Sequence, residues 1–347
     1  MLTQRDLFTS GHESYHTFRI PSIIYTQAGS LLAFCEGRRR GQGDSGDIDI
    51  LLRRSDDGGQ TWSSIQTVWA DPGNTCGNPC PVVDRQNGAI SLLMTHNLGT
   101  DVEHQIIDGT SEGTRTVWLT RSEDDGHTWS PTRNITGTTK KTHWTWYATG
   151  PGAGIQLRSG RLVIPCDHIE ATSKKYFSHV IFSDNGGIGW SLGGTTPQDQ
   201  VNECEVVQLD DGRLLLNMRN YDRNKRTRAV SYSDDEGISW SNPVQKDELV
   251  EPICQASLRR LETAEGTKLL FTNPASEEKR ENMTVRLSDD GGQTWPYQGT
   301  LHAGPAAYSC LVAFPDGQAG CLYECGSNSP YEVIRFAQFD LSWLGAK

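Results

Sequence analysis

Short apolar runs alternate with polar turn segments along the whole chain. Six apolar runs each follow a turn glycine that is usually flanked by Asp, Asn or Ser, and most of these glycines also follow an apolar run; the glycines are Gly29, Gly88, Gly160, Gly212, Gly266 and Gly317. Apolar runs joined by tight polar turns are typical of β-hairpins. The pattern therefore predicts six small antiparallel sheets and little helix.

An eight-residue sequence box recurs between these hairpins. It reads SDDGGQTW at 55–62 and 288–295, SEDDGHTW at 122–129, SDDEGISW at 233–240 and, in an eroded form, SDNGGIGW at 183–190. Asp can accept turn amides, Gly supplies a positive φ, and we expect each Trp to pack between sheets. The box therefore indicates a second hairpin turn in a repeated structural unit.

Four strands in each of six units describe a six-bladed β-propeller, an all-β fold of four-stranded antiparallel sheets. The sixth unit carries no box, and the chain ends about where that box would lie. We expect the N- and C-terminal strands to share a blade and close the ring, which makes residues 1–347 a single domain. A linear β-solenoid is the alternative, but it requires shorter repeats.

Charge and hydropathy narrow the possible partners. A net charge of −11 argues against a general basic face for nucleic acid. An anionic substrate would need arginines that are concentrated locally. No apolar run has the length of a membrane span, and the N-terminus lacks the apolar core of a signal peptide. The expected location is cytoplasmic for the chain as given, and secreted or periplasmic if a signal peptide was removed.

The nine cysteines include no CxxC pair, and their spacing resembles no common zinc pattern. We therefore expect buried free thiols and no metal site.

The hairpins also predict which polar residues meet. The seventh residue after each turn glycine is polar in all six hairpins: Glu36, Thr95, Asp167, Arg219, Asn273 and Glu324. Nine or ten residues before the glycine lie Arg19, Asn78, Gly150 or Pro151, Glu203 and Tyr308. Because the two strands of a hairpin begin and end at the same edge, we expect these residues to share one mouth of the ring. The alternative is that polar strand ends simply meet solvent.

Several motifs then resemble one family. FRIP at 18–21, NECE at 202–205, NMR at 217–219 and AYSCL at 307–311, together with the boxes, resemble exo-sialidases (neuraminidases) of the bacterial and animal type from about Leu7 to Phe339. The resemblance implies a catalytic domain that hydrolyses terminal α-linked sialic acid with retention of configuration and without a cofactor or metal. The implied partners are sialylated oligosaccharides, glycoproteins or gangliosides.

The chemistry of sialic acid explains an unusual nucleophile. Its anomeric carbon already bears a carboxylate, which would repel an attacking carboxylate side chain. Sialidases use a tyrosine instead, and a neutral phenol needs a base to take its proton. The resemblance and the strand positions both indicate Tyr308 as the nucleophile and Glu203 as its base.

The substrate carboxylate needs a cationic clamp, which guanidinium groups supply in bidentate fashion. Arg19 and Arg219 lie at the predicted mouth, and Arg280 matches the third arginine of the family. Glu324 resembles the acidic residue that orients the first arginine.

A general acid must protonate the leaving oxygen and then activate water. Asp44 lies in a glycine-rich loop and aligns with the acid of the family, and Asp47 is the second choice. Asp47 and Asp49 alternate with isoleucines, as at the start of a half-buried strand.

The resemblance also places residues around the sugar ring. Arg38 and Glu36 resemble residues near the 4-hydroxyl, and Asn78 resembles a residue of the N-acetyl pocket. The aromatic side chains of 143–147 would either form an apolar wall for the acetyl group or pack between blades.

Two other function classes remain open. One is a non-catalytic propeller that carries the same boxes and binds glycans or proteins, although it would have no need for this catalytic set. The other is a trans-sialidase or a Kdn-type nonulosonic acid hydrolase, which would share the catalytic residues and differ in pocket lining or loops.

Overall fold

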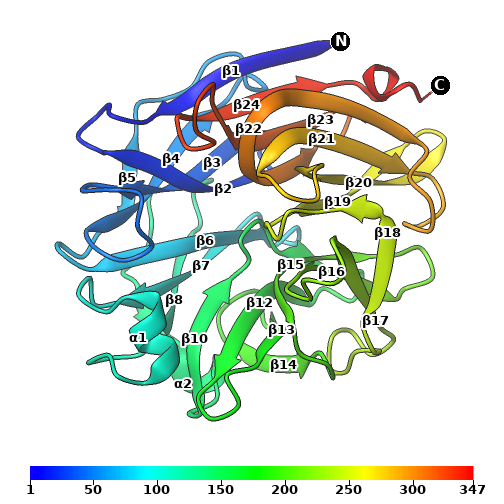
Figure 1. The fold of residues 1–347 in the computed structure, drawn as a ribbon. Coiled ribbons are helices and arrows are strands. Elements are labelled where there is room, and N and C mark those ends of the chain that lie inside the picture. The colour runs from blue at the N-terminus through cyan, green and yellow to red at the C-terminus, as the bar shows by residue number, and fades with distance from the viewer. Residues whose placement is uncertain (347) are drawn as a thin grey trace.

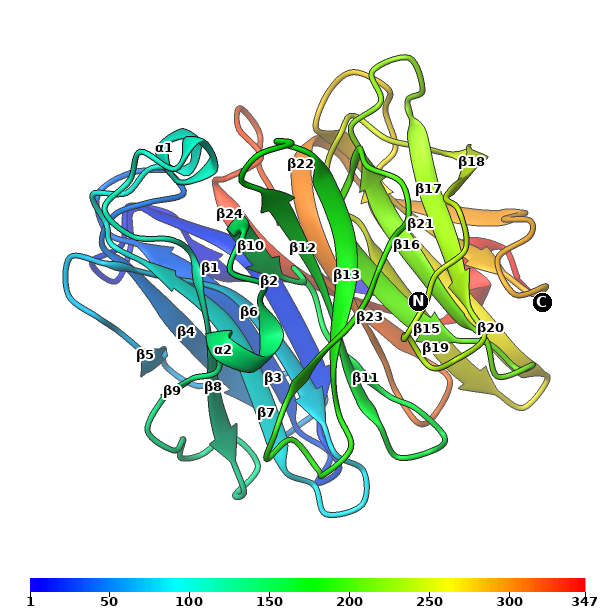
Figure 2. The same cartoon turned by 90° about the horizontal axis from the view of Figure 1, so that it is seen from below.

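The computed structural model describes residues 1–346 and is built almost entirely of antiparallel strands arranged around a common centre (Figures 1 and 2). The helices are short: α1 (Glu103–Asp108), α2 (Thr136–Thr139) and the 3₁₀ helix η1 (Leu341–Leu344). The predicted all-β class is confirmed. In residues 1–346, no helix combines the length and the apolar character needed to cross a membrane.

An eight-stranded sheet has the order β2-β3-β4-β6-β7-β8-β9, with β5 beside β4. A single parallel pairing, Ile48 with Thr75, joins its two groups β2–β5 and β6–β9. Its strands are β2 (Thr17–Tyr25), β3 (Leu31–Arg38), β4 (Ile48–Ser55), β5 (Gln66–Trp69), β6 (Thr75–Val83), β7 (Ile90–Asn97), β8 (Thr116–Ser122) and β9 (Arg133–Asn134).

Two smaller sheets follow. One has the order β10-β12-β13-β14 with β11 beside β12, and the other β15-β16-β17-β18. Their strands are β10 (Trp144–Thr149), β11 (Ile155–Gln156), β12 (Leu162–Glu170), β13 (Tyr176–Ser183), β14 (Ser191–Thr195), β15 (Val201–Gln208), β16 (Leu214–Asn220), β17 (Thr227–Ser233) and β18 (Val244–Val250).

The last sheet brings the two ends of the chain together. Its order is β1-β24-β23-β22-β21-β20-β19, so the N-terminal strand lies beside the C-terminal one (Figure 1). The long strand β22 pairs with β21 through its first half and with β23 through its second. The strands are β1 (Leu2–Thr9), β19 (Ser257–Thr263), β20 (Gly266–Pro274), β21 (Glu281–Ser288), β22 (Tyr297–Ala313), β23 (Ala319–Cys325) and β24 (Val333–Phe339).

The turn glycines lie where the sequence predicts hairpins. All six have a positive φ, from +78° at Gly88 to +116° at Gly266, a region that side chains with a Cβ rarely adopt. Each one lies in or beside the turn that joins two paired strands.

The boxes form a repeated hydrogen-bonded turn. In each box the serine Oγ accepts from the glycine amide four residues later, as in Ser55 with Gly59 at 2.8 Å. Asp57 accepts from the amide and the hydroxyl of Thr61 at 2.8 and 2.6 Å. Trp62 packs edge-on against Phe336 of β24, with ring centroids 5.4 Å apart. The box tryptophan therefore packs against a neighbouring sheet, as predicted.

The core lies between adjacent sheets rather than at the centre of the molecule. The largest apolar cluster joins β2 and β3 to β22, β23 and β24 through residues such as Phe34 and Phe336. All nine cysteines are buried free thiols, as the sequence predicts.

Candidate active site

Irregular strand geometry positions the predicted site residues. Arg19, Asn78, Glu203 and Tyr308 all lie where the pairing of a strand with its neighbour shifts register. The shifts fall between Arg19 and Ser22 on β2, Gly77 and Cys80 on β6, Val201 and Cys204 on β15, and Ala306 and Ser309 on β22. Such bulges redirect side chains next to functional sites.

Tyr308 lies at the centre of a buried hydrogen-bonded group. Its hydroxyl donates to Oε1 of Glu203 at 2.7 Å. Nη1 of Arg219 donates to Oε2 of Glu203 at 2.6 Å and to the Tyr308 oxygen at 3.1 Å. Burial, and then the charge of Glu203, raise the pKa of Tyr308 well above its ordinary value. The phenol is therefore neutral at neutral pH, and its hydroxyl is in direct contact with a carboxylate.

Glu324 links the first arginine to the strand that carries Tyr308. Its Oε1 accepts from Nε of Arg19 at 2.8 Å, and its Oε2 accepts from the backbone amide of Tyr308 at 3.1 Å. Because Glu324 is fully buried, this carboxylate holds the two residues in fixed relation.

The three predicted arginines surround Tyr308. Besides the hydrogen bond from Arg219, the guanidinium carbons of Arg19 and Arg280 lie 5.0 and 5.7 Å from the centroid of the Tyr308 ring. Nη1 of Arg280 donates to the hydroxyl of Tyr331 at 2.8 Å. This concentration of positive charge contrasts with the net charge of −11 on the chain.

Asp44 lies beside this group, whereas the two neighbouring aspartates are engaged elsewhere. Its Oδ1 is 2.8 Å from Nη1 of Arg38 and 3.9 Å from Nη1 of Arg19, and about half of its side chain is exposed (53%). Burial acts to raise the pKa of Asp44, but the guanidinium groups of Arg38 and Arg19 outweigh it and lower that pKa. Asp49 is buried against Tyr15, and Asp47 accepts from the amide of Gly73.

Glu36 supports its neighbours and does not face open space. Its Oε2 accepts from Nη2 of Arg38 at 2.6 Å, and its Oε1 from the backbone amide of Asn78 at 2.8 Å. The side-chain oxygen of Asn78 accepts from Thr95 at 3.0 Å. The seventh-position residue Asn273 bonds instead to the carbonyl oxygen of Val250 and to Arg286, so it does not join these contacts.

The aromatic segment 143–147 contains three buried aromatic side chains, Trp144, Trp146 and Tyr147. Trp144 is buried and stacks on His168 with ring centroids 3.4 Å apart, and Tyr147 is fully buried. These two side chains therefore pack within the fold and form no wall for a ligand. The ring of Trp146 lies 4.0 Å from the guanidinium carbon of Arg115.

Arg115 is a buried arginine that the sequence reasoning missed. Burial lowers its pKa, while the nearby carboxylates Glu36 and Asp44 act in the opposite direction. Tyr331, which contacts Arg280 and lies 4.1 Å from the guanidinium carbon of Arg19, was also missed. Both residues are in loops, outside the positions counted from the turn glycines, so no sequence signal distinguishes them from surface residues.

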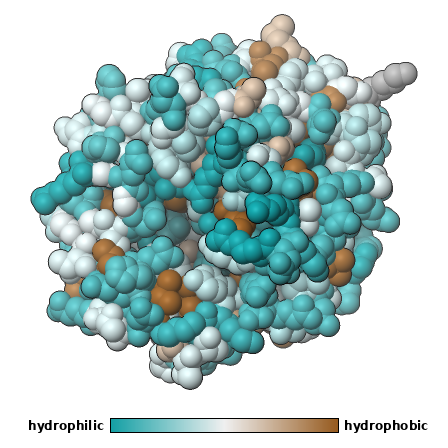
Figure 3. All heavy atoms as spheres, viewed as in Figure 1, coloured by the Kyte–Doolittle hydropathy of each residue, from teal (hydrophilic) through white to brown (hydrophobic). Residues whose placement is uncertain are grey.

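The face that carries α1 is largely hydrophilic and hollowed near its middle (Figure 3). Within residues 1–346, no cluster of three or more His, Cys, Asp or Glu side chains could hold a metal ion.

Known proteins share both the repeat and the fold. The family model described as a BNR repeat-like domain matches residues 29–321. A sialidase of Micromonospora viridifaciens is 34% identical over 99% of this chain, which spans only 55% of that protein. An exo-alpha-sialidase of Aspergillus fumigatus is 32% identical over 95% of this chain and 85% of its own length.

A solved structure, the Hadza microbial sialidase Hz136, superposes with a TM-score of 0.91 at 31% identity, covering 99% of this chain and 69% of that one. The repeat and the sheets therefore define a BNR-repeat protein with a propeller-like all-β fold. Within that class, the chain belongs to the sialidase family.

Proposed function

We propose that this chain is a retaining exo-α-sialidase that uses Tyr308 as its nucleophile. The observation that carries the proposal is the contact of the Tyr308 hydroxyl with Glu203 inside a ring of three arginines. The sialidase relatives support the reaction class. The substrates are sialylated oligosaccharides, glycoproteins or gangliosides, and no step calls for a cofactor or metal.

In the first step, the Tyr308 oxygen attacks the anomeric carbon while its proton passes to Glu203. The bond from that carbon to the glycosidic oxygen breaks, and Asp44 gives its proton to the departing oxygen. The product of this step is a tyrosyl-linked sugar. Because the phenol is neutral before attack, the carboxylate of the substrate does not repel it.

In the second step, water replaces the tyrosine. Asp44, now ionised, takes a proton from the water as the water attacks the anomeric carbon. The bond to Tyr308 breaks, and Glu203 returns its proton to the phenolic oxygen. Two inversions at one carbon give net retention of configuration.

The clamp and the acid are coupled through Arg19. This guanidinium helps to keep Asp44 ionised when no ligand is bound. A substrate carboxylate held by Arg19, Arg219 and Arg280 would offset that positive charge. The pKa of Asp44 would then rise in the complex, as its role as an acid requires. Arg38, Glu36 and Asn78 would line the remainder of the sugar site.

The proposal extends to the architecture. We infer six blades: the groups β2–β5, β6–β9, β10–β14, β15–β18, β19–β21 with the first half of β22, and the second half of β22 with β23, β24 and β1. Residues 1–347 would then form one catalytic domain in which β1 completes the last blade.

The test follows the products of 3′- and 6′-sialyllactose hydrolysis by NMR. Initial release of the α-anomer of sialic acid is expected, together with a loss of turnover on the order of 10³-fold or more in Tyr308→Phe at an unchanged melting temperature. Initial release of the β-anomer, or near-normal turnover by Tyr308→Phe, would contradict the mechanism. Transfer to lactose in place of water would indicate a trans-sialidase.

A further inference from the structure

A second cavity opens at the end of the molecule opposite the candidate active site. Strands β2, β6 and β15 and the second half of β22 carry site residues toward one end and line this cavity at the other. Its volume of about 580 Å³ is in the range of small-molecule sites, roughly 300–1,000 Å³. The apolar residues of its wall include Ile23, Val82, Ile155, Val207, Leu311 and Val312.

Buried, hydrogen-bonded polar groups lie between the candidate active site and this cavity. Ser22 donates to the carbonyl oxygen of Gly152 at 2.8 Å. The side-chain amide of Gln255 donates to the carbonyl oxygens of Pro151 and Ser309 at 3.1 and 2.8 Å. A molecule in the second cavity would therefore be separated from Tyr308.

Four arginines and one glutamate are the charged residues that line the cavity. Two of these arginines are neutralised at its rim. Arg158 and Arg260 lie 3.4 and 2.7 Å from Asp210, and Arg260 also pairs with Glu262 at 2.6 Å.

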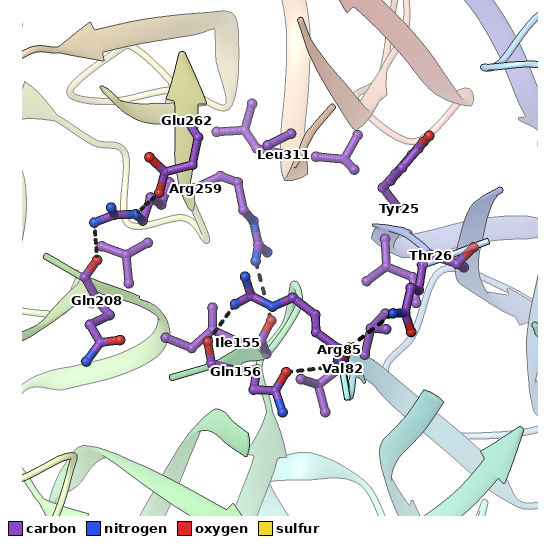
Figure 4. A pocket seen from close by; sticks show the side chains of 18 of the residues that line it. Tyr25, Thr26, Val82, Arg85, Ile155, Gln156, Gln208, Arg259, Glu262 and Leu311 are labelled. Carbon is purple, nitrogen blue, oxygen red and sulfur yellow. Dashed lines mark hydrogen bonds and ion pairs between the residues drawn. The ribbon is translucent and has the colours of Figure 1, made fainter. Parts of the chain in front are cut away.

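The other two arginines, Arg85 and Arg259, form no ion pair with any residue of 1–346, and their guanidinium groups donate hydrogen bonds only to backbone oxygens. Arg85 donates to the carbonyl oxygen of Gln156 at 2.7 Å, and Arg259 to that of Gly154 at 3.4 Å. These oxygens are two residues apart, so one segment holds both guanidinium groups. Figure 4 shows the two side chains pointing toward one another across the cavity.

Groups on the interior side of Arg259 only partly neutralise its positive charge. Its Nε and Nη2 are buried and have no hydrogen-bond partner in the described chain. Glu205 lies further inside, where burial raises its pKa to about 7 against the opposing effect of Arg259. This carboxyl therefore carries only part of a negative charge at neutral pH.

We propose that this cavity binds a small organic carboxylate with an apolar body, held between Arg85 and Arg259. A carboxylate would relieve the repulsion between the two cations and accept hydrogen bonds from both. The aliphatic wall would cover the apolar part of the ligand. The proposal does not depend on the reaction at the other end of the molecule.

The test uses 4-iodobenzoate, whose iodine is located by anomalous diffraction from soaked crystals. We expect an iodine peak in the cavity with the carboxylate between Arg85 and Arg259. The double variant Arg85→Gln/Arg259→Gln should lose this peak at the same soak concentration. Arg158→Gln removes the same charge from an arginine already paired with Asp210, so it should keep the peak.

Melting temperatures test the same binding in solution, because a ligand that binds only the folded state raises the melting temperature. The increase produced by 4-iodobenzoate should be smaller in the double variant than in the wild type or Arg158→Gln. If the double variant does not fold, Arg85→Gln alone, at an exposed position, should reduce the increase. No peak in the wild-type cavity, or equal peaks and increases in all variants, would overturn the proposal.

Discussion

At the scale of single residues, the proposed role of Asp44 as the general acid distinguishes a hydrolase from a protein that only binds the glycan. A general acid matters most when the leaving oxygen is a poor leaving group. For Asp44→Asn we expect kcat/KM to fall about 10²- to 10⁴-fold with sialyllactose, and far less with a 4-nitrophenyl sialoside, whose phenolate leaves without protonation. Asp47→Asn is the matched control, because Asp47 contacts the Gly73 amide and lies 3.8 Å from Arg39. Leaving-group dependence in Asp47→Asn instead would move the acid to that residue.

A substitution of Arg280 tests the proposed carboxylate clamp. Lysine keeps the positive charge but loses the planar fork that binds a carboxylate through two nitrogens. Since hydrogen bonds to charged groups are worth about 1.5–3 kcal/mol, Arg280→Lys should raise KM roughly 10- to 100-fold and change kcat less. Arg5→Lys, at an exposed position on β1, should change neither constant. An unaltered KM in Arg280→Lys would remove that residue from the clamp.

At the scale of elements, strands β12 and β13 bury a histidine pair that should make stability depend on pH. Nδ1 of His168 lies 3.0 Å from Nδ1 of His179, and both rings are enclosed by Trp144 and neighbouring strands. Burial lowers the pKa of both histidines, that of His179 to about 3 from an ordinary 6.5. The folded protein therefore resists protonation, whereas the unfolded chain accepts protons below about pH 6.5.

The stabilisation from His179 is thus complete above about pH 6.5 and is lost as the pH falls toward 3, by about 1.4 kcal/mol per pH unit. Urea unfolding between pH 7 and 4 should show a shallower pH dependence in His179→Gln than in the wild type. The exposed His12→Gln should keep the wild-type slope. Parallel curves for the wild type and His179→Gln would mean that His179 does not contribute to the loss of stability in acid.

The elements also show which features can be predicted from sequence. The turn glycines and the boxes can be recognised from the local sequence, because a positive φ and turn hydrogen bonds need particular residues at fixed spacing. Asparagine tolerates a positive φ such as the +52° of Asn78, but a single asparagine does not signal a bulge by itself. The bulge arises from the pairing of two strands, so counting from the turn glycine found the position of Asn78 but not the geometry.

At the scale of the whole molecule, one physical reason explains why the sequence did not predict four of the residues described above. Arg115 and Tyr331 reach the candidate site from loops of different sheets. At the opposite end of the molecule, Arg85 and Arg259 both bind carbonyl oxygens of the segment 154–156. Their contacts depend on how all the sheets are arranged around the centre, which no local pattern specifies. The residues predicted correctly to meet, such as Arg19 with Glu324 and Glu203 with Tyr308, lie at equivalent positions of repeated units.

The proposed mechanism requires a covalent bond between the sugar and Tyr308. In 2,3-difluorosialic acid, fluoride is a leaving group that needs no acid, and the second fluorine slows breakdown of the intermediate by withdrawing electrons from the anomeric carbon. Mass spectrometry of the digested protein after this treatment should find one sugar adduct, on the peptide that contains Tyr308, and none in Tyr308→Phe. An adduct on Glu203 or Asp44, or inactivation with no covalent adduct, would contradict the tyrosyl mechanism.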